Sequence, residues 1–164
     1  HAIHLEGEEF QRMAEANAAI SFCPTSNLFL GSGLFNLGEA EKYGVEVGLG
    51  SDVGAGTSFS MLETLNEAYK VCQMRGHKLD PFKSFYLATL GGAKALNIAD
   101  KVGNFMPGKE ADFIVLDKAA TPLLERRLKN CRTIDETLFV LSVLGDDRTI
   151  SHTYIAGTLR HQRG

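Results

Sequence analysis

Two side chains in this sequence stand where an enzyme could use them, His1 and Asp52. Asp52 follows the apolar run 45–49 and precedes two glycines, Gly54 and Gly56. We therefore expect it at the carboxyl end of a strand, in a loop that leads to a helix. In α/β barrels this is where the catalytic residues lie. The alternative is an aspartate that only hydrogen-bonds nearby backbone amides in a turn.

Residues 1–5 are expected to be the tail of a second strand, with His1 at the strand end and His4 in the loop that follows. A histidine and an aspartate at one barrel mouth can bind a hydrolytic metal and can position or deprotonate an attacking water. Zinc needs at least three protein ligands, however, and the sequence has no HxH pair and no HExxH motif. His1 and Asp52 therefore predict part of a metal site, and not a complete one.

The remaining histidines and cysteines are weaker candidates. His4 would point to the opposite side from His1 on a regular strand. His77 falls in a polar loop and is expected to be solvated, while His152 and His161 belong to a terminal hairpin. Cys23 ends a strand with no histidine marked near it, so a buried structural thiol is the better interpretation.

The composition limits the classes of protein to which this chain can belong. The chain has 164 residues, 44% of them hydrophobic, 23% charged, and a formal net charge of −3. This predicts a folded domain without the basic field that attracts nucleic acid or an anionic membrane. No apolar run is long enough to span a bilayer, and we expect no signal peptide. Three widely spaced cysteines suit a reducing compartment, so we expect the cytoplasm.

The first two thirds of the chain should be built from β/α units. Short apolar runs predict strands at residues 1–5, 19–23 and 45–49, and a polar loop over 24–33. Helical spacing predicts helices at 8–18, 36–43 and 58–75, and a further helix that begins at Asp80-Pro81 and continues past a Gly91-Gly92 pair. Such alternation is typical of parallel strands.

The final third has a different character. Turn residues at 103–110 precede a predicted strand at 111–117, a helix at 133–144, and a hairpin of strands 149–155 and 158–161. We therefore expect an α/β chain with two parts, residues 1–102 and residues 103–164.

Several motifs together resemble one family. They are His1-Ala-Ile-His-Leu5, Phe22-Cys-Pro-Thr-Ser-Asn-Leu-Phe-Leu-Gly-Ser-Gly33, Gly48-Leu-Gly-Ser-Asp-Val-Gly-Ala-Gly56, Ala88-Thr-Leu-Gly-Gly-Ala-Lys-Ala95, Gly108-Lys-Glu-Ala-Asp-Phe113 and Leu144-Gly-Asp-Asp-Arg148. The chain resembles the C-terminal portion of the guanine deaminases, a family of the amidohydrolase superfamily. The last motif is the one that points to guanine deaminases in particular.

The resemblance implies a fold and a reaction. Residues 1–102 would form the C-terminal part of a distorted (β/α)8 barrel, with the end of its sixth strand, its seventh and eighth strands and their helices. Residues 103–164 would form part of a small β-sandwich. The reaction implied is the hydrolytic deamination of guanine to xanthine and ammonia in purine catabolism, by a cytoplasmic homodimer that uses Zn²⁺, with Fe²⁺ as the alternative metal.

The resemblance also assigns roles to the two candidate residues. Asp52 would be a metal ligand, the group that accepts the proton of the attacking water, and a contact to the purine. His1 would lie beside the metal and hydrogen-bond the attacking hydroxide, close enough to count as a second ligand in some relatives.

The family's HxH pair, fifth-strand histidine and catalytic glutamate have no counterpart in these 164 residues. We therefore expect a fragment, a domain of a longer chain or a processed product that neither holds zinc tightly nor deaminates guanine by itself. Two alternatives stay open. One is another amidohydrolase acting on an aminated ring, such as a triazine hydrolase or an adenosine-type deaminase, and the other is a non-catalytic structural domain.

Overall fold

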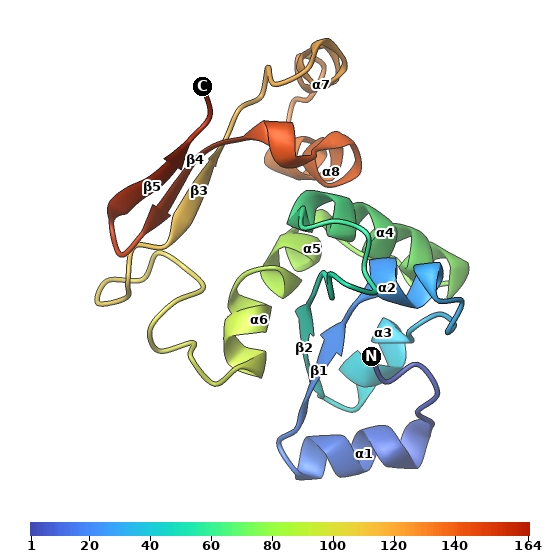
Figure 1. The fold of residues 1–164 in the computed structure, drawn as a ribbon. Coiled ribbons are helices and arrows are strands. Elements are labelled where there is room, and N and C mark those ends of the chain that lie inside the picture. Colours follow the sequence, from blue (N-terminus) through green and yellow to red (C-terminus); the bar gives the residue numbers. More distant parts are fainter.

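The computed structural model describes all residues from His1 to Gly164 and has two α/β parts (Figure 1). The first part contains two strands and six helices. They are α1 (Gly7–Glu15), β1 (Ala19–Phe22), α2 (Pro24–Phe29), α3 (Leu37–Lys42), β2 (Glu46–Leu49), α4 (Met61–Met74), α5 (Pro81–Leu87) and α6 (Leu90–Ala95).

The two strands of the first part pair in parallel, as the alternation of strands and helices predicts. Ala19 lies opposite Glu46 and Phe22 opposite Leu49, so both strands end at the same edge of the sheet. Helix α6 packs against β2. This contact is close because Gly48 on the strand faces Gly92 on the helix, where a Cβ on Gly48 would come within 2.8 Å of the Gly92 Cα.

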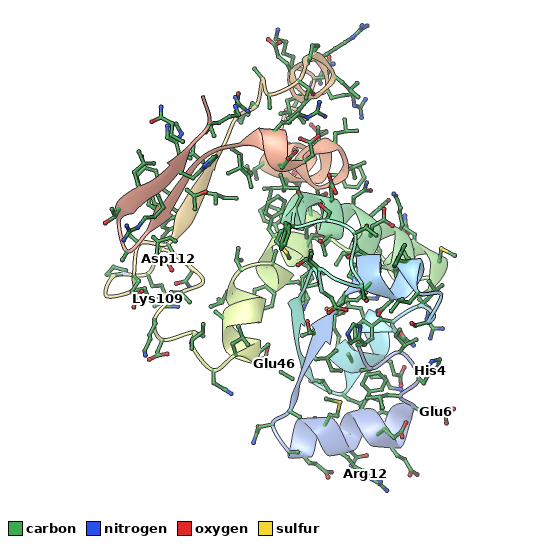
Figure 2. All side chains as sticks on the ribbon, in the orientation of Figure 1. His4, Glu6, Arg12, Glu46, Lys109 and Asp112 are labelled. Carbon is green, nitrogen blue, oxygen red and sulfur yellow. The ribbon has the colours of Figure 1, made fainter.

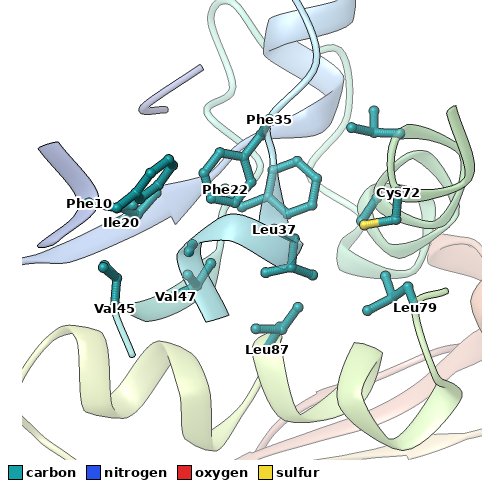
Figure 3. Packing of buried hydrophobic residues seen from close by; sticks show 13 residues of the cluster. Phe10, Ile20, Phe22, Phe35, Leu37, Val45, Val47, Cys72, Leu79 and Leu87 are labelled. Atoms are coloured by element: carbon teal, nitrogen blue, oxygen red, sulfur yellow. The ribbon is translucent and has the colours of Figure 1, made fainter. Parts of the chain in front are cut away.

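A cluster of thirteen buried apolar residues lies between the strands and the helices around them (Figure 3). The rings of Phe22 and Phe35 are tilted against each other, with 4.9 Å between their centroids. Both are fully buried, together with Leu37 and Val71. Burying one such side chain stabilises the fold by about 1.5–3 kcal/mol, so this cluster anchors the strand ends on which the candidate site depends.

The second part is a three-stranded antiparallel sheet with two helices and one short 3₁₀ turn. Its elements are β3 (Phe113–Leu116), α7 (Pro122–Leu128), α8 (Ile134–Leu144), η1 (Asp147–Thr149), β4 (Ile150–Ile155) and β5 (Thr158–Gln162). The strand order is β3-β4-β5, which confirms the predicted hairpin. Helix α8 packs against α4 and α5 and so joins the two parts (Figure 1).

The structure corrects the predicted elements at several points. Residues 1–5 form a turn without ladder hydrogen bonds, and Ala2 has a φ of 51°, so the expected strand there is wrong. The first six residues of the expected loop at 24–33 are helix α2, with Pro24 in its first turn. The helix that begins after Asp80 ends at Leu87, and α6 starts after Thr89. The Gly91-Gly92 pair lies within α6 and provides the close contact with β2 instead.

No helix in the structure has both the length and the apolar character needed to cross a lipid bilayer. The longest, α4, has 14 residues.

Candidate functional site

The two candidate residues lie beside each other at one open hollow of about 550 Å³. The hollow is lined by residues of the first turn of the chain, of helix α2 and of the loop after β2, including His1, Ser26, Asn27 and Asp52. His1 Nε2 is 3.5 Å from Asp52 Oδ2. The fold therefore brings together two side chains that are 51 positions apart in the sequence.

Asp52 owes its position to the loop that leaves β2. Strand β2 ends at Leu49, and Asp52 adopts a φ of 49°, a left-handed conformation that aspartate tolerates better than most residues. Its backbone carbonyl accepts hydrogen bonds from the N–H groups of Ala55 and Gly56. A Cβ on Gly56 would overlap the Ser51 carbonyl oxygen, so only glycine fits in this tight turn.

The Asp52 carboxylate itself makes no hydrogen bond to a backbone amide. Its side chain is 39% exposed and faces His1. The alternative in which this carboxylate merely caps a turn is therefore wrong. The backbone of Asp52 forms the turn, and the carboxylate stays free for a ligand.

His1 is oriented by Asn27. The imidazole Nδ1 lies 2.7 Å from the Asn27 Oδ1, and the His1 side chain is 49% exposed. An amide oxygen only accepts hydrogen bonds, so Nδ1 carries the proton in this pair. In the neutral ring, Nε2 then presents a lone pair toward Asp52. This arrangement, in which the second nitrogen of a histidine donates to an oxygen, is the usual one around metal-binding imidazoles.

When the His1 ring is neutral, the spacing of His1 Nε2 and Asp52 Oδ2 fits two corners of a zinc site. A lone pair on His1 Nε2 and a carboxylate oxygen 3.5 Å away repel each other unless a cation or a hydrogen-bond donor lies between them. Two ligands that are each about 2.1 Å from a tetrahedral zinc ion stand about 3.4 Å apart. His1 and Asp52 can thus supply two of its ligands, and no third histidine, cysteine, aspartate or glutamate side chain joins them in a cluster.

Helix α2 contributes two residues that the sequence did not single out. Thr25 Oγ1 donates a hydrogen bond of 3.1 Å to the carbonyl oxygen of Ser51, the residue before Asp52, and Asn27 contacts His1. The signal for them was the polar run Thr-Ser-Asn directly after a buried strand. In a simple solvent-exposed loop these side chains would not be buried.

The remaining histidines lie outside the pair. His4 lines the hollow without contacting Asp52, and His77 Nε2 is 3.3 Å from Glu41 Oε2 rather than fully solvated. In the terminal sheet, His152 lies opposite Val115 and Gln162, and His161 lies opposite Thr153. None of them approaches the candidate site as a further ligand.

Two of the motifs that carry the family resemblance have structural roles. Lys109 donates to the carbonyl of Val102, and Asp112 accepts a hydrogen bond of 2.7 Å from the Ala156 N–H in the hairpin turn. Both side chains lie beside the terminal sheet, across the molecule from His4 (Figure 2). Asp146 caps η1 and binds Arg148. These contacts stabilise the second part and its connection to the first, and the motifs do not line the hollow.

The model of the family described as the Amidohydrolase family matches residues 1–160. The guanine deaminase of Escherichia coli is 55% identical over 163 residues, which are 99% of this chain and 37% of that protein. A solved structure of E. coli guanine deaminase covers 100% of this chain and 38% of its own, with a TM-score of 0.98.

More distant structures agree in fold. A guanine deaminase from C. acetobutylicum, solved with guanine in its active site, is 31% identical and covers 97% of this chain and 38% of its own, with a TM-score of 0.81. An adenosine deaminase from Xanthomonas campestris, solved with bound zinc, is 25% identical and covers 97% of this chain and 35% of its own, with a TM-score of 0.83. The chain spans little more than a third of the length of these relatives.

Proposed function

Because this chain belongs to the amidohydrolase family, we propose that it supplies His1 and Asp52 to the active site of a guanine deaminase. The reaction is the hydrolytic deamination of guanine to xanthine and ammonia. The observation that carries the proposal is the approach of His1 Nε2 to within 3.5 Å of Asp52 Oδ2, at the open edge where both strands end. The likeness to the guanine deaminases supports this choice among the reactions of the family.

The proposed architecture follows the same relatives. Residues 1–102 would complete the last strands of a (β/α)8 barrel, with β1 as the seventh and β2 as the eighth strand, and residues 103–164 would join a β-sandwich. The parallel pairing of β1 with β2 supports the first assignment, and the separate antiparallel sheet supports the second. In this arrangement the hollow beside His1 and Asp52 opens at the carboxyl ends of the strands, where such barrels bind their substrates.

Asp52 is the proposed proton acceptor. Its carboxylate is accessible and free of backbone hydrogen bonds, so it can take a proton from the water that adds to the amino-bearing carbon of guanine. It is also the proposed contact to the purine. His1 is placed to accept a hydrogen bond from the same water through Nε2, because Asn27 holds its other nitrogen. Where Nε2 binds a metal directly, its one lone pair is used there and this hydrogen bond is not made.

His1 and Asp52 are also the proposed ligands of Zn²⁺ or Fe²⁺, for which their spacing is suitable. The chemistry that such a metal supplies when bound is a lowered pKa of its water. The zinc in the adenosine deaminase of X. campestris supports this choice.

We propose a cytoplasmic location from the state of the cysteines. Cys23, Cys72 and Cys131 are all free thiols, which suits the reducing cytoplasm. A role in purine catabolism and assembly as a homodimer rest on the likeness to the guanine deaminases. Size-exclusion chromatography with light scattering tests the homodimer.

Ammonia release from a panel of substrates tests the proposed function. The full-length enzyme that carries this chain should release ammonia from guanine at least a hundredfold faster than from adenine, cytosine or an aminated triazine. Equal or greater activity on adenine or on the triazine would mean that this compound, and not guanine, is the substrate. Absence of turnover on every member of the panel would favour the structural domain.

A further inference from the structure

Three consecutive polar side chains on α2 are almost completely buried beside the candidate site. The exposed fractions are 6% for Thr25, 1% for Ser26 and 2% for Asn27. Burying a hydroxyl or an amide costs free energy unless a partner compensates for the lost water. The Ser26 Oγ and the Asn27 Nδ2 have no hydrogen-bond partner. The side chain of Asn27 is thus used only through its oxygen, which contacts His1 Nδ1 at 2.7 Å.

The backbone holds Asn27 in one place. Its N–H donates to the carbonyl of Cys23 at 3.0 Å, and its carbonyl accepts from the N–H of Ser32 at 2.9 Å. With the main chain fixed on both sides and the side chain buried, the Asn27 Oδ1 has little freedom to move. It is the buried, rigid partner of the half-exposed His1 ring.

An amide at position 27 affects the His1 ring differently from a carboxylate. The neutral Oδ1 accepts the Nδ1 proton of His1 without adding a negative charge near Asp52. In a neutral ring, the Nε2 lone pair then faces the Asp52 carboxylate 3.5 Å away. An apolar residue of the same size would leave the ring free to rotate and to exchange tautomers.

We propose that Asn27 is a positioning residue that holds His1 in its Nδ1-protonated tautomer, so that Nε2 faces the reacting water beside Asp52. This inference rests on the proposed function for its catalytic consequence. The tautomer itself does not depend on which substrate the enzyme uses, because it is set by the contact between Asn27 and His1.

The test measures tautomer and activity separately in the full-length enzyme that carries this chain. With ¹⁵N-labelled histidine, long-range ¹H–¹⁵N spectra at pH 8 report which nitrogen of His1 is protonated. The wild type should show the Nδ1–H form. Asn27→Leu should show an exchanging mixture, and Asn27→Asp, which keeps an acceptor oxygen, should retain the Nδ1–H form. Asn130→Leu after α7, which removes an exposed amide that bonds only the Arg126 carbonyl, is the matched control and should leave the signals unchanged.

The kinetic expectation follows from the same contact. Asn27→Leu should lower kcat by about 10–100-fold with a smaller change in KM, since partners that orient a metal-binding histidine typically have effects of this size. An Nε2–H tautomer in the wild type would overturn the proposal, even if Asn27→Leu does not fold. So would unchanged spectra and unchanged kcat in a folded Asn27→Leu. A wild type that shows the Nδ1–H form but does not act on guanine would refute the proposed function alone.

Discussion

The hydroxyl of Thr25 donates a hydrogen bond of 3.1 Å to the carbonyl oxygen of Ser51. This contact ties helix α2, which follows β1, to the loop that follows β2 and carries Asp52. Helix α2 therefore helps to stabilise the turn around Asp52, in addition to the hydrogen bonds that Ala55 and Gly56 donate within the turn. Asn27, two residues after Thr25, orients His1 from the same helix.

Removing this hydroxyl should weaken both the fold and the site. We expect Thr25→Val to lower the free energy of unfolding by about 1–2 kcal/mol, because the Ser51 carbonyl loses its partner. It should also lower kcat/KM about tenfold or more, since a displacement of about 1 Å at a catalytic group can cost 10²-fold. Urea unfolding and steady-state kinetics measure the two effects.

Two further variants separate the hydrogen bond from the loss of a hydroxyl in general. Thr25→Ser keeps the donor and should stay near the wild type. Thr137→Val removes a threonine hydroxyl that bonds the Thr133 carbonyl on the exposed face of α8, and it should leave kcat/KM unchanged. Equal losses in Thr25→Val and Thr25→Ser would show that the contact with Ser51 does not hold the loop.

The contact between Gly48 and Gly92 predicts an asymmetric response to alanine. Gly48→Ala places a methyl group 2.8 Å from the Gly92 Cα and should lower the free energy of unfolding by about 1–3 kcal/mol. Gly92→Ala meets only the Leu87 carbonyl oxygen, at 3.7 Å, and gains helix propensity, so it should be neutral or slightly stabilising. Thermal unfolding of the two variants compares them, and equal destabilisation would contradict the packing of β2 against α6.

The three thiols should differ in reactivity. Burial, with a smaller contribution from Glu41, raises the pKa of Cys72 to about 12, so this thiol stays protonated at pH 8. Cys72 and Cys23 are 1% and 3% exposed, whereas Cys131 is half-buried. A disulfide reagent at pH 8 should therefore modify one thiol quickly and the other two only after unfolding. Cys131→Ser should remove the fast phase, and a fast phase that survives this substitution would contradict the assignment.

The raised pKa of Cys72 also predicts how the free energy of unfolding changes at alkaline pH. Its pKa is raised in the folded state, so its contribution is fully present below the ordinary thiol pKa near 9 and is lost as the pH rises toward 12. Cys72→Ala should unfold at a urea midpoint that changes less between pH 8.5 and pH 11 than that of the wild type. A steeper change in the variant would reverse the predicted sign.

Asp146 should contribute to acid sensitivity. The Arg148 guanidinium, bonded to its carboxylate at 3.0 Å, lowers the pKa of Asp146. A lowered folded-state pKa means that the contribution is present above about pH 4, the ordinary aspartate value, and is lost as the pH falls below it. Asp146→Asn should therefore flatten the decline in unfolding free energy between pH 4 and pH 2. A decline in Asp146→Asn as steep as that of the wild type would contradict this assignment.

The elements that sequence patterns predicted are those with strong local signals. Strands β1 and β2 come from short apolar runs, and α4 has a clear apolar face with Ser60 as its N-cap. Helix α2 was missed because Thr, Ser and Asn favour loops in isolation. In this fold the side chains of Thr25 and Asn27 instead bond groups outside the helix. Helix α7 was missed as well, since its seven residues are too few to show a period.

The candidate site was predictable only in part. Asp52 is marked by the glycines around it, and its strand-end position is a local property. The approach of His1 depends on tertiary packing, since residues 1–5 form no strand and their position is set by contacts such as that between Ile3 and Gly33. Asn27 could not be inferred from periodicity, because its importance comes from one contact across 26 residues.

Guanine turnover by the Asp52→Asn variant tests the central claim most directly. In the full-length enzyme that carries this chain, xanthine formation by the wild type should be readily measured. Asp52→Asn should lower kcat at least 10²-fold, because the proposed proton acceptor is lost. Asp100→Asn, which neutralises an exposed aspartate far along the chain, should keep wild-type kcat. A wild type that forms no xanthine, or an Asp52→Asn variant as active as the wild type, would contradict the account.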